Sequence, residues 1–158
     1  MKIIVLLLAL LCVNSAFAYD EAPTRQELQK WRTDADNGDP EAQFNVAEAY
    51  RKGDVVEQNE QEAAKWYERA ANQGYPEAMF DMGFVYRGGN GVAMDKILSY
   101  MWFYLAVKNG DKRAMGLMND LAWSMSEDEI KQGRRKANEW KPEKEEGIKK
   151  RNKRRLDE

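Results

Sequence analysis

Cysteine and histidine are almost missing from this chain of 158 residues. Cys12 is its single cysteine, and it contains no histidine. From residue 13 onward the chain therefore cannot form an internal disulfide, use a thiol nucleophile or an imidazole base, or build the common zinc sites. Serine is scarce too: beyond residue 18 only three serines remain, and none has lysine three residues later. The Ser-x-x-Lys signature of penicillin-interacting enzymes is thus excluded.

The first 18 residues predict an export signal. Lys2 precedes an apolar run over residues 3–13, and residues 16–18 read Ala-Phe-Ala, the small-x-small pattern that signal peptidase accepts. The apolar run is too short to cross a bilayer, which takes roughly 20 residues. We expect cleavage after Ala18, a mature chain that does not span a membrane, and a periplasmic or secreted location.

An internal repeat of 36 residues is the strongest pattern in the remaining chain. Residues 39–74 and 75–110 share 11 identities in 36 ungapped positions, against two or three expected by chance. The shared residues include Gly53 and Gly89, Trp66 and Trp102, and Gly74 and Gly110.

Each repeat unit is predicted to be a pair of helices joined by a turn. Pro40 and Pro76 suit the first turn of the first helix, and Asn59 and Asp95 suit the N-cap of the second. Capping boxes at residues 24–27 and 126–129 open further helices at the two ends, and Asp111 can cap another helix that runs to about residue 124. The sequence therefore predicts an all-α protein of seven helices without strands.

The spacing of these residues resembles the Sel1-like repeat, a relative of the tetratricopeptide repeat. The second unit matches the motif through Ala78, Met82-Gly83, Tyr86, Gly89-Asn90-Gly91-Val92, Asp95, Trp102-Phe103, Ala106 and Gly110. The resemblance implies a right-handed α-solenoid of stacked helix-turn-helix repeats that acts as an adaptor or scaffold for other proteins. Bacterial members of the family often carry export signals.

With this resemblance the chain divides into six segments. We expect a cleaved signal peptide (1–18), an N-terminal capping helix (19–38), a first repeat (39–74), a second repeat (75–110), a C-terminal half-repeat with a capping helix (111–141) and a basic tail (142–158). Atypical elements at the ends are what a stacked array needs to cover its open faces.

The first helices of such units usually line the concave side of the solenoid, so the variable positions there are the candidate binding residues. Phe84 stands where the first unit has Glu48 and where the third has Asp120, and an aromatic at an otherwise acidic position is a candidate anchor. The alternative is that Phe84 packs against the next helix. The candidates are Asn45, Glu48 and Arg51 in the first unit and Asp81, Phe84 and Arg87 in the second.

The second helix of the second unit, residues 96–108, is apolar on almost every side. A helix of this kind is normally buried. We expect it to lie beneath the closing helix that starts at residue 126; a dimer or partner interface is the alternative.

The chain ends in a basic segment. Residues 147–156 carry +6 without an acid, whereas 22 acidic and 16 basic residues give residues 19–140 a net charge of −6. We expect a solvated tail, with weak contact to an anionic surface as the functional alternative and nucleic acid excluded for lack of interleaved aromatics. Its charged residues are Lys149, Lys150, Arg151, Lys153, Arg154 and Arg155.

Taken together, these patterns predict a protein-binding adaptor, not an enzyme, and call for no cofactor or metal. Its expected partner is an unidentified periplasmic, envelope or secreted protein. Two alternatives stay open: a secreted factor that acts on a host or neighbouring cell, and a protein that binds or cleaves cell-wall glycan through scattered carboxylates.

Overall fold

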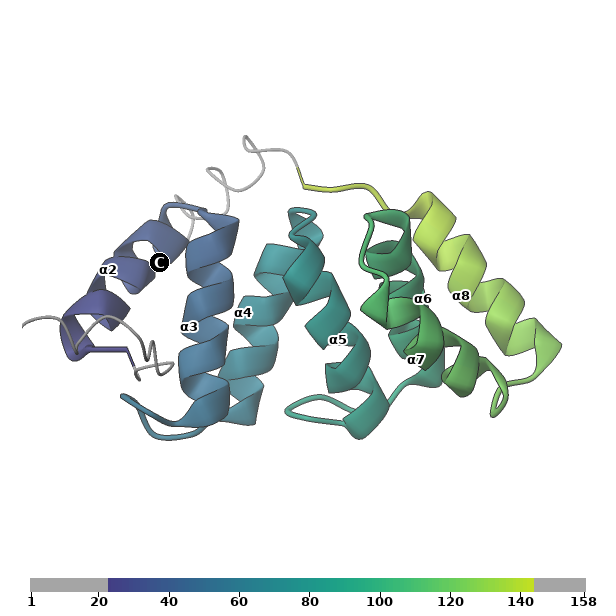
Figure 1. Cartoon of the computed structure of the whole chain (residues 1–158), viewed down its shortest axis with the longest axis horizontal. Helices are drawn as coiled ribbons and strands as arrows, with labels where there is room; N and C mark the ends of the chain where they lie inside the picture. The colour runs from purple at the N-terminus through teal and green to yellow at the C-terminus, as the bar shows by residue number, and fades with distance from the viewer. Residues whose placement is uncertain (1–22, 144–158) are drawn as a thin grey trace, which may run out of the picture.

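The computed structural model describes residues 23–143. This part of the chain forms seven α-helices and no strand, as predicted. Figure 1 shows the helices following one another along the long axis of the molecule, with α2 at one end and α8 at the other. The helices are α2 (Arg25–Asp36), α3 (Pro40–Lys52), α4 (Glu60–Asn72), α5 (Pro76–Gly88), α6 (Lys96–Lys108), α7 (Arg113–Ala122) and α8 (Glu127–Glu139).

Local sequence signals set the ends of most helices. Asn59 and Asp95 accept a backbone N–H with their side chains at the starts of α4 and α6, and both predicted capping boxes form at the starts of α2 and α8. Gly53 and Gly89 end α3 and α5 with φ of 77° and 72°, a left-handed conformation that favours glycine. The repeated residues therefore cut the chain at the same places in both units.

Helix α7 departs from the prediction at both ends. It begins at Arg113, because Lys112 has helical dihedrals without a side-chain cap, and it ends at Ala122 instead of residue 124. The Asp111 carboxylate still accepts the Arg113 N–H at 2.9 Å, so it satisfies one free donor of the first turn. No proline fixes the start of α7 as Pro40 and Pro76 do for α3 and α5.

Small residues let the two helices of a repeat pack closely. Gly83 on α5 lies so near α6 that a Cβ at this position would sit 2.4 Å from the Phe103 ring. The Ser99 hydroxyl on α6 donates a hydrogen bond to the Gly83 carbonyl at 2.7 Å. Phe103 is completely buried, and it belongs to a core cluster that contains many buried alanines. This contact holds the second repeat together.

Helix α6 is buried beneath α8, as predicted. Tyr100, Trp102 and Phe103 on α6 are buried, and α8 crosses α6 where Gly133 would place a Cβ 2.8 Å from the Tyr100 ring. The rings of Trp102 and Trp140 meet edge to face with centroids 6.2 Å apart. The closing helix thus covers the apolar surface that the end of the second repeat leaves.

The chain turns back toward the first repeat after α8. Pro142 lies near Gly74, and the Glu143 N–H donates to the Asn72 carbonyl at 2.8 Å. The first two residues assigned to the basic tail therefore contact the end of α4. The remaining tail residues, including the six from Lys149 to Arg155, and the expected signal peptide lie outside the described residues.

We predict that Gly83→Ala lowers the free energy of unfolding by about 1–3 kcal/mol, because the added methyl group overpacks the core against Phe103. Urea unfolding followed by circular dichroism measures this. Gly116→Ala is the matched control: it also places alanine within a first-type helix, but in open space, and is expected to stabilise by up to about 1 kcal/mol. Equal effects of the two substitutions would contradict the packing argument.

Candidate partner-binding surface

The six candidate residues lie on the same side of two consecutive first helices. Three come from α3 and three from equivalent positions of α5, where they occupy one face because their spacing is three residues. Asn45, Glu48 and Asp81 are half-buried, and Arg51, Phe84 and Arg87 are exposed. The side chains of the next helix decide which of them are held in place.

In the first repeat, Tyr67 connects the core to the surface. Its ring is buried on α4, and its hydroxyl donates a short hydrogen bond to the Glu48 carboxylate and accepts one from Arg51 at 3.1 Å. Arg51 also binds Glu48 through two hydrogen bonds of 2.7 and 2.8 Å. A charged pair is thereby fixed at a defined point of the surface.

These contacts shift the protonation equilibria of the network. Burial alone would raise the pKa of Glu48, but the hydrogen bonds from Arg51 and Tyr67 and the nearby positive charges outweigh it and lower the pKa to about 2. Burial and the bond to Glu48 raise the pKa of the Tyr67 hydroxyl. Glu48 is therefore charged and Tyr67 neutral throughout the physiological range.

In the second repeat, the equivalent pair is apolar. Phe84 replaces Glu48 and Phe103 replaces Tyr67, and their rings meet at 90° with centroids 5.4 Å apart. The ring centroids of Phe84 and Phe80 are also 5.1 Å apart, yet Phe84 stays 39% exposed. The aromatic ring thus packs against the next helix, as one reading of the sequence expected, and still presents an apolar edge to solvent.

Asp81 lies between these two pairs without a hydrogen-bond donor among the described residues. Burial, and next the charge of Glu48, raise its pKa to about 6, although Arg51 and Arg113 act in the opposite direction. Both arginines are engaged elsewhere: Arg51 by Glu48 and Arg113 by Asp111 through bonds of 2.6 to 3.2 Å. Asp81 thus feels the charge of both arginines but receives a hydrogen bond from neither.

A cavity of about 270 Å³ opens at this place between the first and second repeats. Arg51, Asp81 and Phe84 line it, whereas Asn45 and Arg87 do not. The structure therefore brings Arg51, Asp81 and Phe84 together, with Glu48 joined to the cavity wall through its hydrogen bonds to Arg51 and Tyr67. Arg87 is exposed and makes no ion pair to another described residue.

Trp123 occupies the repeat position of Arg51 and Arg87 and was missed from the sequence. It is 91% exposed and follows α7 one repeat after Arg87, which itself follows Arg51 by one repeat. The 36-residue shift that relates the candidates of the first unit to those of the second also relates Arg87 to Trp123. A shallow hollow beside it is lined by Asn119, Ala122 and Trp123.

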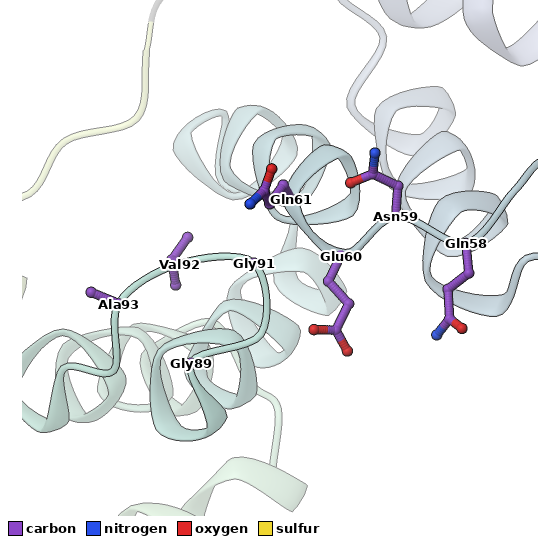
Figure 2. Close-up of a pocket in the computed structure, with 8 residues that line it drawn as sticks. All are labelled: Gln58, Asn59, Glu60, Gln61, Gly89, Gly91, Val92 and Ala93. Atoms are coloured by element: carbon purple, nitrogen blue, oxygen red, sulfur yellow. The ribbon is translucent and has the colours of Figure 1, made fainter.

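A second hollow, on the turns, offers no comparable chemistry. It measures about 680 Å³ and is open, and Figure 2 shows the loop from Gly89 to Ala93 beside the start of α4. The Asn90 side chain closes one edge by donating to Glu60 at 3.1 Å. Within residues 23–143, no group of carboxylates is placed to hold a metal ion, and no helix is long and apolar enough to cross a bilayer.

These features define a class of protein: an α-solenoid of helix pairs that presents a surface rich in aromatic and charged residues. The Sel1 repeat family model matches residues 40–75 and 76–111. A crystal structure of a Sel1 repeat protein from Oxalobacter formigenes is 34% identical with a TM-score of 0.58, and the match covers 59% of this chain and 70% of that one. The chain belongs to the Sel1 repeat family, whose members generally mediate protein–protein interactions and are generally not enzymes.

A second solved structure extends the comparison. A protective antigen present in uropathogenic Escherichia coli strains, displaying an SLR fold, is 28% identical with a TM-score of 0.69, and the match covers 72% of this chain. The chain spans only 24% of the length of that protein. None of the curated proteins gives a significant match.

We predict that Asp81→Asn changes how stability depends on pH. The pKa of Asp81 is higher in the folded chain, about 6, than its ordinary value of 3.8. Its contribution to stability is therefore fully present below pH 3.8 and is lost as the pH rises through about 6. Asp81→Asn should remove this loss and raise the free energy of unfolding at pH 7 by about 1 kcal/mol. This is less than the full pKa shift of Asp81 would give, because its carboxylate is partly solvated.

Urea titrations at a series of pH values from 4 to 7 check this expectation. The exposed Asp120 on α7 provides the control, because Asp120→Asn should keep the parent profile. A difference between the parent and Asp81→Asn that stays constant from pH 4 to pH 7 would show that the pKa of Asp81 is not raised by folding.

Proposed function

We propose that the protein is an exported adaptor that binds a periplasmic, envelope or secreted protein through the side of α3, α5 and α7 described above. The observation that carries this proposal is the exposure of two large aromatic side chains, Phe84 and Trp123, at candidate surface positions of consecutive repeats. Aromatic side chains dominate the binding energy of protein interfaces when a partner desolvates them.

The arrangement of the surface supports a protein partner over a small ligand. Phe84 and Trp123 belong to successive repeats, so a partner must extend along the solenoid to cover both. The Glu48–Arg51 pair is held by Tyr67 before any partner arrives, which lowers the entropy lost on binding. A chain segment of several residues meets these conditions better than a compact metabolite does.

Export is supported by the sequence. Residues 1–18 have the charge, apolar run and cleavage pattern of a signal peptide, and the rest of the chain contains no thiol that an oxidising compartment would alter.

Site-specific photocrosslinking tests the surface. With a photoreactive residue at Arg87 in cells, we expect one discrete crosslinked protein. The same residue at Lys65, on the exposed side of α4, should give none, because it lies on a second helix outside the surface.

The double variant Phe84→Ala and Trp123→Ala should weaken this crosslink at least tenfold with unchanged helicity, because it removes both exposed rings. Met94→Ala, which trims an exposed apolar residue of the turn, is the matched control. Equal crosslinking at Arg87 and Lys65 would argue against this surface.

A second candidate is a factor that acts outside the cell on a host or neighbouring cell. The solved structure of a protective antigen from uropathogenic strains favours it, since an antigen that protects meets the host. This candidate uses the same binding surface but differs in location.

We predict that the mature chain is recovered outside the cytoplasm and begins at Tyr19. N-terminal sequencing of protein from periplasmic extract and from culture medium checks both points. Recovery mainly from the periplasm favours the adaptor, and recovery from the medium favours the secreted factor. An intact N-terminus at Met1 in the cytoplasm would refute export.

A further inference from the structure

The carboxylate of Asp81 is partly buried and makes no hydrogen bond or ion pair to another described residue. Arg51 and Arg113 are the positive groups that lower its pKa, but each makes two or more hydrogen bonds to another carboxylate. A partly buried charge without a partner is costly, and such groups are normally paired. The position therefore calls for a positive group from outside the chain.

The cavity beside Asp81 has the size and lining for one long side chain. Its 270 Å³ correspond to roughly nine water molecules at about 30 Å³ each, slightly below the range of about 300–1,000 Å³ that is typical of small-molecule sites. Ala63, Ala64 and Val85 line it with apolar atoms, and Phe84 contributes an aromatic ring. An aliphatic stem with a charged end matches this combination of walls.

We infer that this cavity is a specificity pocket for a basic side chain, lysine or arginine, of the bound partner. The inference rests on the proposed function and names the chemistry of the partner at this point of the surface. The aliphatic stem lies along Ala63, Ala64 and Val85, the cation approaches the Phe84 ring, and its charge pairs with Asp81.

The other charged groups around the cavity are compatible with a cation. Glu48 pairs with both Arg51 and Lys52, and Asp111 pairs with Arg113. The charged residues that line the cavity are one base, Arg51, and two acids, Asp81 and Glu60, so the lined space has a net negative charge. An acidic side chain of a partner would meet repulsion here and is selected against.

Binding of short capped peptides to the full mature chain tests the inference directly. The probes are acetyl-Gly-Lys-Gly-amide, its arginine counterpart, and a norleucine peptide that keeps the stem of lysine without its charge. Two-dimensional NMR at low salt and pH 7.5 should show saturable shifts around Asp81 and Phe84 with a basic peptide. The norleucine peptide should produce none.

Asp81→Asn should weaken this binding about tenfold, because it removes the charge and keeps the shape of the side chain. Asp120→Asn, an exposed acid at the position of Phe84 one repeat later, should leave it unchanged. As a second readout, a bound cation should lower the pKa of Asp81 followed by carboxyl ¹³C NMR.

Equal binding of the basic peptides to the parent chain and to Asp81→Asn, or equal binding of the norleucine peptide, would overturn the inference. The adaptor proposal would survive that result as long as the crosslink at Arg87 persisted. If no protein is crosslinked at Arg87 but the basic peptides still bind in a way that depends on Asp81, the adaptor surface is rejected and the pocket is kept.

Discussion

The structure depends on the close contact between the two helices of each repeat, where a small residue on the first helix faces a large aromatic on the second. Ala47 and Gly83 occupy the small position, Tyr67 and Phe103 the large one, and all four are buried. At Gly83 the approach is so close that no side chain fits above Phe103. This contact fixes the distance between the helices, and with it the positions from which the surface residues project.

The same aromatic position links the core to the surface chemistry. Where it is Tyr67, its hydroxyl reaches the surface and holds Glu48, which in turn holds Arg51. Where it is Phe103, the hydroxyl is missing, and the residue equivalent to Glu48 is Phe84, whose ring packs on Phe103. The presence or absence of this one hydroxyl group thus accompanies a change from a charged pair to an aromatic edge on the surface. Asp81 lies where the polar and apolar repeats meet, which explains both its burial and its lack of a partner.

The sequence predicted the regular part of this structure well, because helix ends and packing positions are local and repeat every 36 residues. It could not predict the burial of Asp81, which results from contacts between two repeats. It also missed the exposure of Trp123. The turns before α4 and α6 have seven residues, but the one before α8 has four, and α8 packs against α6 instead of pairing closely with α7. Met115 is therefore 49% exposed, whereas Met79, its equivalent one repeat earlier, is buried.

Repeats that share a backbone but differ at the surface present a series of different contacts at constant spacing. One row of equivalent positions holds Glu48, Phe84 and Asp120, and a second holds Arg51, Arg87 and Trp123. On the proposed binding surface, a compact ligand would meet only one member of each row, whereas an extended partner would meet all of them in order. Selectivity then comes from the sequence of contacts along the rows, since each wrong pairing places a charge against an aromatic ring or a like charge. In the proposed adaptor, the solenoid supplies the spacing, and the residues that depart from the repeat supply the recognition.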